Sequence, residues 1–283
     1  MVDTVAVLTH PTPSQEAEVA ETARRLSRAY LSFKPPKTRV GAAISPRVGM
    51  APMDAAAAPP MQSFDWRDRI QISPPGSQGS CNACSSFAIA ATIEATWLIS
   101  HPGNLIAVSP GYIHTCVGHN GDTDANAICA EGIDSTALLG LLQVNGYAQS
   151  SPGDFPFPTS ACAAAAILGT IASYATIAGP NDAKNSIVNK GPLVADMYVW
   201  QDFFSYTTNR ASTYVPDTTS AGPYLHTICV VGFGSTGWII KNSYGPSWGD
   251  GQGFAIIPYT ACGLLGGTPP AGGFPREASS ITL

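Results

Sequence analysis

Apolar positions along the chain fall into short blocks, which predict helices in its first half and strands in its second half. Residues 84–100 are small and apolar with hardly a break, and this run is long enough for a buried helix. Residues 132–145 show a second helical pattern, which Asp134 or Ser135 can cap and Gly146 ends. Short β-rich runs bounded by glycine or proline follow, at residues 192–199, 227–233, 237–241 and 253–257. These blocks predict an α+β fold in two halves.

The N-terminal part of the chain has a different pattern. Residues 14–33 predict an amphipathic helix that Ser14 can cap, with acidic residues early and arginines toward its end. Residues 34–62 are rich in alanine, proline and methionine, which is typical of a linker. We therefore expect residues 1–61 to be a separate segment, either a disordered tail or a short propeptide, and residues 62–283 to form the folded domain.

Composition limits the class of protein. Of the 283 residues, 45% are hydrophobic and 12% are charged, which is enough apolar material for a core and argues against wholesale disorder. The net charge is −5 and no Lys/Arg cluster stands out, so we expect no nucleic-acid partner. No run of about 18 apolar residues occurs, so no membrane partner is expected. The N-terminus lacks a basic start, so a secretory signal is absent or has been trimmed away.

The chain has an odd number of cysteines. The seven are Cys81, Cys84, Cys116, Cys129, Cys162, Cys229 and Cys262. At least one thiol should therefore be free unless it pairs between chains. Several disulfides would indicate secretion or another oxidising compartment, whereas the missing signal argues the other way, so the localisation stays open.

The segment directly before the first apolar run carries candidate chemistry. It reads Gln-Gly-Ser-Cys-Asn-Ala-Cys and places Cys84 at the start of the expected helix, where unpaired backbone N–H groups favour a thiolate and should lower the thiol pKa. A thiolate is the attacking species in acyl transfer, and Gln78 can supply a donor to the oxyanion. The alternative is a C-x-x-C metal or redox pair, but zinc needs two further ligands and a redox motif needs a preceding strand.

A histidine and an asparagine can complete such a site. His226 enters an apolar β-rich run, and Asn242 follows a second run of the same kind. Two adjacent strands can bring these residues together, and the amide oxygen can then accept the imidazole N–H and fix the ring. The alternatives are a structural histidine and an ordinary turn asparagine.

Together these segments resemble the papain family of cysteine peptidases. The text C-N-A-C-S at 81–85 stands where that family has C-G-[SA]-C-[WY], with its histidine and asparagine far downstream. Three further stretches match family motifs, at 65–67 (D-W-R), 191–194 (G-P-L-V) and 241–249 (K-N-S through W-G). The order of these motifs is more specific than any one of them, and the resemblance covers residues 62–267.

The resemblance implies a papain-like two-lobed α+β fold, with a helical left half, a β-barrel-like right half and the active-site cleft between them. Residues 62–283 would be the catalytic domain of a cysteine endopeptidase that works through a Cys thiolate and an acyl-enzyme. Cys84 would be the nucleophile, His226 its base, Asn242 the residue that orients the histidine, and Gln78 an oxyanion donor. The implied partner is a peptide or protein substrate in extended conformation, and neither cofactor nor metal is expected.

The sequence departs from the family pattern at four places. Asn82 replaces a glycine, Ser85 replaces the aromatic residue after the nucleophile, and Tyr244 stands where the family has tryptophan. The last two changes leave the triad chemistry intact but loosen its apolar shell, in which Tyr244 and Trp248 would shield the His–Asn hydrogen bond. Residues 1–61 are too short for the family's long inhibitory propeptide, yet we expect them to be regulatory and able to cover the cleft.

The resemblance also implies the disulfide pairing. Cys81 should pair with Cys129, and Cys116 with Cys162, so that both bridges staple the helical half. Cys262 resembles a half-cystine whose usual partner is missing, and we expect Cys229 to be a buried free thiol. The polar loop between Cys116 and Cys129 could bind calcium, but we favour the alternative that it is a solvated surface turn.

The resemblance further implies how substrate binds. The backbone of Gly132 would pair with the extended substrate, and the main specificity pocket would be walled by Ile133, Asp134, Asp196, Leu225 and Gly267. Asp196 is unusual there, since an unpaired buried acid is costly. It either binds a substrate Lys or Arg or turns away to backbone N–H groups. The stretch between Gly132 and Cys162 has no room for a long cleft-blocking insertion, so the cleft should be open at both ends.

Two other functions remain as alternatives. One is a Cys–His amidase that acts on non-protein amides, against which the spacing of Gln78 and Cys84 argues. The other is a catalytically weak or inactive binding protein of the same fold, against which the retention of Cys84, His226, Asn242 and Gln78 argues.

Overall fold

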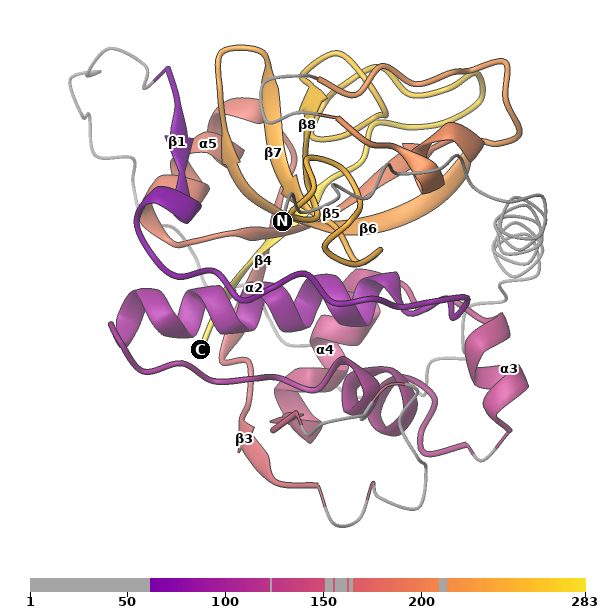
Figure 1. Ribbon diagram of the computed structural model, residues 1–283. Helices are drawn as coiled ribbons and strands as arrows, with labels where there is room; N and C mark the ends of the chain where they lie inside the picture. The colour runs from indigo at the N-terminus through magenta and orange to yellow at the C-terminus, as the bar shows by residue number, and fades with distance from the viewer. Residues whose placement is uncertain (1–61, 123, 151–154, 156–161, 163–164, 209–212) are drawn as a thin grey trace, which may run out of the picture.

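The computed structural model describes residues 62–122, 124–150, 155, 162, 165–208 and 213–283. Within these ranges the chain forms two layers, with the strands of a large sheet over a layer of helices (Figure 1). The helix expected at residues 14–33 lies outside the described residues, and the regulatory role of residues 1–61 stays a prediction. No helix in the described ranges combines the length and hydrophobicity needed to cross a membrane.

Helix α2 (Cys84–Ser100) is the part of the helical layer that packs directly against the sheet. Figure 1 shows the sheet on one side of it and helix α4 (Ser135–Asn145) on the other. Both Ile89 and Ile93 are completely buried against the α4 side, while Ala91 packs with Cys229 on the sheet side. A helix that is apolar all round belongs in an interior, so the predicted span 84–100 is confirmed together with its burial.

The helical half surrounds α4. It also contains the π-helical segment η2 (Tyr112–Gly118), helix α3 (Ala125–Ala130) and the small sheet of β2 (Tyr147–Ala148) and β3 (Ile167–Gly169). The Asp134 carboxylate accepts a 2.8 Å hydrogen bond from Ala137 N, so Asp134 is the cap of α4. Helix α4 ends at Gly146, whose φ of 72° is a conformation that glycine adopts at little cost.

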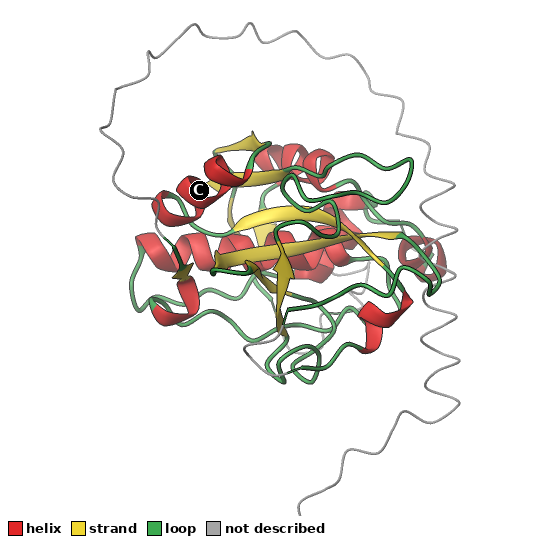
Figure 2. Ribbon diagram, turned by 90° about the horizontal axis from the view of Figure 1, so that it is seen from above, coloured by secondary structure: helices red, strands yellow, loops and turns green. Residues whose placement is uncertain are grey.

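The sheet half is an antiparallel sheet of seven strands, with order β4-β9-β5-β6-β7-β8 and β1 paired to β6. Seen from above in Figure 2, its strands lie in front of the helices. The strands are β1 (Phe64–Asp65), β4 (Ser173–Ile177), β5 (Leu193–Val199), β6 (Tyr224–Phe233), β7 (Gly237–Lys241), β8 (Phe254–Pro258) and β9 (Ala278–Thr282). Three short helices flank it, namely η1 (Trp66–Asp68), α5 (Pro180–Asn189) and η4 (Gln201–Ser205).

Two disulfides staple the helical half. Cys81 is bonded to Cys129 and Cys116 to Cys162, the pairing that the resemblance implies. The three other cysteines are free: Cys229 and Cys262 are buried, and Cys84 is partly exposed. The Cys81–Cys129 bridge joins the segment before α2 to the end of α3, so it fixes the chain where it enters the central helix.

We expect the double variant Cys81→Ser/Cys129→Ser to lose about 2–5 kcal/mol of free energy of unfolding, because a native cross-link restricts the unfolded chain. Urea denaturation of the wild type and the variant, followed by fluorescence, measures this loss. In the presence of a strong reductant the two proteins should unfold at similar urea concentrations. Equal midpoints without reductant would contradict the prediction.

Candidate active site

The thiol of Cys84 lies at the first residue of α2, at the seam between helical layer and sheet. The segment before it is tied to α3, since Asn82 N donates to Cys129 O at 3.0 Å and Asn82 Nδ2 to Ala130 O at 2.8 Å. Asn82, which stands where the resemblance expects glycine, thus supplies a side-chain bond that a glycine could not make. The nucleophile segment is held in place from both its backbone and its side chain.

The surroundings of Cys84 raise the pKa of its thiol. Burial is the largest cause, a hydrogen bond from the Thr227 backbone lowers the pKa, and the Asp196 carboxylate raises it again. The expectation of a lowered pKa is therefore wrong, because burial and the Asp196 charge raise the pKa of Cys84 by more than its hydrogen bonds lower it. A thiolate at Cys84 can therefore form only when another group takes the proton of the thiol.

His226 and Asn242 meet at the ends of neighbouring strands. His226 lies on β6 and Asn242 directly follows β7, and the pairing of Cys229 with Lys241 sets these two strands in register. His226 Nε2 donates to Asn242 Oδ1 at 2.7 Å, and both residues are buried. This bond places the proton on Nε2, so Nδ1 of the neutral ring carries the free lone pair. Burial lowers the pKa of His226 to about 4, although the bond to Asn242 raises it.

An aromatic group covers the His226 ring. The Tyr244 ring lies 4.9 Å from it between centroids, and the Phe203 ring lies 5.7 Å from it. The Trp248 ring lies 4.8 Å from the Phe203 ring at a tilt of 58°, and its indole N–H donates to Phe203 O at 2.7 Å. Phe203 could not be predicted from the sequence, because η4 carries no motif and meets the site only through tertiary packing.

Gln78 is buried beside the nucleophile segment. Its Oε1 accepts from Ser243 Oγ at 2.6 Å, and its Nε2 donates to Cys81 O at 2.7 Å. An amide nitrogen has two hydrogens, so a second N–H remains for an oxyanion. Gln78 N also donates to Ser243 O at 2.9 Å, which ties the nucleophile segment to the residue after Asn242.

Two of the expected pocket residues take part in a chain of polar contacts that crosses the seam. Ser85 Oγ donates to Ile133 O at 2.6 Å and lies 3.2 Å from Thr227 Oγ1. Thr227 Oγ1 donates to Asp196 Oδ1 at 2.7 Å, and Ser135 Oγ donates to Asp196 Oδ2 at 3.3 Å. Ser85 and Thr227, which sequence reasoning assigned no role, therefore link the nucleophile helix to the strand that carries His226. The only sign in the sequence is a polar residue directly after each of Cys84 and His226.

The other expected pocket residues are placed differently. Asp134 is exposed and caps α4. Leu225 pairs with Tyr198 across β5 and β6, and Gly267 packs so tightly that a side chain would meet Ala261 O at 2.5 Å. Gly132 lies beside Asn82, where a Cβ would be 3.8 Å from the Asn82 carbonyl oxygen.

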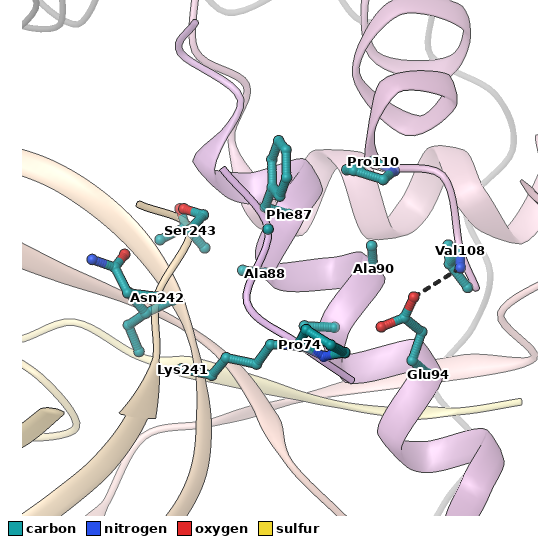
Figure 3. A pocket seen from close by; sticks show the side chains of 14 residues that line it. Pro74, Phe87, Ala88, Ala90, Glu94, Val108, Pro110, Lys241, Asn242 and Ser243 are labelled. Atoms are coloured by element: carbon teal, nitrogen blue, oxygen red, sulfur yellow. Dashed lines mark hydrogen bonds between the residues drawn. The ribbon is translucent and has the colours of Figure 1, made fainter. Parts of the chain in front are cut away.

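A cavity of about 100 Å³ with a mainly apolar lining lies behind the site, between α2 and the ends of β6 and β7. Figure 3 shows Lys241 and Glu94 reaching toward it from opposite sides. Lys241 Nζ donates to Ser73 Oγ at 2.8 Å, Ser73 Oγ donates to Glu94 Oε2, and Val108 N donates to Glu94 Oε1 at 2.8 Å. Burial lowers the pKa of Lys241, and the Glu94 carboxylate raises it. These buried charges hold the two halves together directly next to Asn242.

The described residues contain no group of three His, Cys, Asp or Glu side chains that could hold a metal ion. Cys84 offers a free thiol, His226 a neutral imidazole whose tautomer Asn242 fixes, and Gln78 a second amide N–H besides the one that binds Cys81 O. This set of groups can perform acyl transfer without a bound cofactor.

Comparison with known proteins gives consistent results. The family model of papain family cysteine proteases matches residues 60–265. A probable cysteine protease of Arabidopsis thaliana is 28% identical over 240 residues, which cover 73% of this chain and 62% of that protein. Cathepsin K of Mus musculus is 27% identical over 213 residues, which cover 71% of this chain and 62% of cathepsin K. The chain thus spans 62% of the length of both relatives.

Solved structures share the fold. Procathepsin L2 from the larval midgut of Tenebrio molitor matches with a TM-score of 0.60 and 26% identity, over 81% of this chain and 70% of that one. A procathepsin B of Trypanosoma congolense matches with a TM-score of 0.64 and 19% identity, over 94% of this chain and 88% of that one, which shows the fold alone. With the family model covering most of the sequence, the chain belongs to the papain family of cysteine proteases.

Proposed function

We propose that this protein is a cysteine endopeptidase, which hydrolyses peptide bonds through an acyl-enzyme on Cys84. The observation that carries the proposal is the 2.7 Å bond between His226 Nε2 and Asn242 Oδ1. It leaves Nδ1 as the basic nitrogen of a ring that lies at the seam where Cys84 begins α2. A purely structural histidine would not need an amide that fixes its tautomer beside a free, partly exposed thiol.

The groups can act in this order. Cys84 gives its proton to His226 Nδ1, and the sulfur attacks the substrate carbonyl to form a tetrahedral oxyanion that accepts hydrogen bonds from Cys84 N and Gln78 Nε2. The His226 imidazolium then protonates the leaving amine as the C–N bond breaks, which leaves a thioester. Water, activated by the neutral ring, hydrolyses the thioester and restores the thiol. Asn242 holds the ring throughout.

Cleavage within chains is the finer part of the proposal. The stretch between Gly132 and Cys162 has no room for a long insertion, and the backbone of Gly132 beside Asn82 can pair with an extended peptide that runs through the cleft. Release of only dipeptides from a protein substrate would point to an exopeptidase instead.

A panel of fluorogenic dipeptide substrates tests the activity. We expect Cys84→Ala to abolish turnover, and Gln78→Ala to lower kcat roughly 10²–10³-fold, the effect of losing one oxyanion donor. Gln149→Ala, a change at an exposed glutamine whose side chain donates to Ser150 O, serves as the matched control and should keep the wild-type rate. Hydrolysis that survives Cys84→Ala would overturn the proposed function, and near-full activity of Gln78→Ala would remove Gln78 as a donor.

We further propose that Asp196 selects a basic side chain at the second residue before the scissile bond. Its carboxylate is only partly exposed, its pKa is raised chiefly by burial, and its charge acts on Cys84, so it lies close to the reacting thiol. The hydroxyl groups of Thr227 and Ser135 occupy one site on each of its oxygens, and each oxygen can accept a further bond.

Paired substrates with Arg or Leu at that position test the role of Asp196. We expect the wild type to prefer Arg, and Asp196→Asn to reduce that preference about tenfold, because a neutral amide cannot form the charge-assisted hydrogen bond. The ratio of kcat/KM for the two substrates is the measurement, and Asp134→Asn is a control that removes an exposed acid nearby. An Arg preference that survives in Asp196→Asn, or a Leu preference in the wild type, would exclude Asp196 from substrate choice.

A further inference from the structure

The second ring nitrogen of His226 is already engaged. Nε2 is bound to Asn242, while the Tyr244 hydroxyl lies 3.3 Å from Nδ1. Nδ1 is the atom that has to take the proton of Cys84. Among the described residues, the hydrogen bonds of the His226 ring run to Asn242 and Tyr244, and none runs to Cys84.

The position of the Tyr244 ring is fixed by its surroundings. The ring stacks on Phe204 at 5.6 Å with an interplanar angle of 20°, and it meets Trp248 edge-on at 6.0 Å. The backbone is held as well, because Tyr244 pairs with Ser77 in an isolated β-bridge and Gly245 N donates to Gly76 O at 2.9 Å. The hydroxyl therefore stays at Nδ1 without needing a mobile side chain.

We propose that Tyr244 is a positioning residue that competes with Cys84 for Nδ1 of His226. Because Nε2 carries the ring proton, Nδ1 of the neutral imidazole is an acceptor and the phenol O–H is the donor. This bond stabilises the neutral thiol and neutral imidazole over the thiolate and imidazolium, since a hydrogen bond to the neutral form disfavours the charged one. No proton passes to the phenol: the ring and its oxygen stay in place, and the O–H bond rotates away from Nδ1 when Cys84 transfers its proton. The proposal rests on the proposed role of His226 as base.

The charges around the site are consistent with this competition. Burial raises the pKa of Tyr244 well above 10, so its hydroxyl keeps its proton and remains a donor at neutral pH. Asp196 on β5 raises the pKa of Cys84, while Asp134 raises and Arg276 lowers that of Asp196. Burial and the Asn242 bond, rather than any charged group, are the causes that move the pKa of His226. The phenol is thus the group in direct contact with Nδ1.

Alkylation of Cys84 by iodoacetamide between pH 6 and 11, mapped by peptide mass, tests the proposal without requiring peptide turnover. Tyr244→Phe keeps the ring and removes the hydroxyl, so the thiolate should form at lower pH. We expect the midpoint of the alkylation profile to fall by about 0.5–1 pH unit and the rate below the midpoint to rise roughly fivefold, the effect of one neutral hydrogen bond. The buried Cys229 and Cys262 report on any opening of the fold.

Tyr206→Phe is the matched control. Tyr206 lies 5.9 Å from Trp248 in the same aromatic group, and its buried hydroxyl has no hydrogen-bond partner among the described residues. Its removal should leave the midpoint unchanged. Tyr244→Trp is the second variant if Tyr244→Phe is unstable, and it should also lower the midpoint.

An unchanged midpoint in the Tyr244 variants would show that the hydroxyl does not compete for Nδ1, and a higher midpoint would show that it assists the thiolate. Either result overturns the proposal. If the midpoint falls as expected but the wild type hydrolyses no peptide, the endopeptidase function fails while the role of Tyr244 holds.

Discussion

The hydrogen bond from His226 Nε2 to Asn242 Oδ1 is the contact on which the rest of the site depends. An imidazole has two nitrogens, and fixing the proton on one of them decides what the other can do. The bond is short at 2.7 Å and buried, and its two residues come from the ends of paired strands. The sheet therefore acts as the rigid support that fixes the tautomer of His226 and leaves Nδ1 as its acceptor nitrogen.

The second feature of the site is that Cys84 and His226 lie on opposite sides of the seam between the two layers, Cys84 on α2 and His226 on β6. Helix α2 is buried against both, so Cys84 is fixed by packing on the helical side and faced by Thr227 on the sheet side. Polar contacts cross the seam in two places. Beside the thiol they run through Ser85, Thr227 and Asp196. Behind the site they run through Ser73, Glu94 and Lys241. The chain has the hydroxyl group of Ser85 where the resemblance expects an aromatic residue after the nucleophile, and this hydroxyl helps to join the two halves.

The sequence predicted those features that a local pattern decides. Residues 84–100 are apolar all round and form the buried helix, and Asp134 is placed to cap α4. Helix α5 was missed because its ten residues are largely polar and few of them are buried, and β9 because two serines interrupt its apolar pattern. In the site, too, local motifs could be predicted from the sequence and tertiary contacts could not. The groups Cys84, His226, Asn242 and Gln78 could be named from motifs, but the raised pKa of Cys84 depends on packing against β6, and the contact of Tyr244 with Nδ1 depends on Phe203, Phe204 and Trp248.

Trapping with an epoxide that alkylates activated thiols tests most directly whether these residues form one catalytic unit. The protein would be incubated with the epoxide, digested, and searched by mass for the modified cysteine, in parallel with His226→Ala. We predict a single adduct on Cys84 in the wild type and a large loss of that adduct in His226→Ala, while Cys229 and Cys262 stay unmodified. An adduct that forms at the same rate without His226, or no adduct on Cys84 at all, would contradict the account.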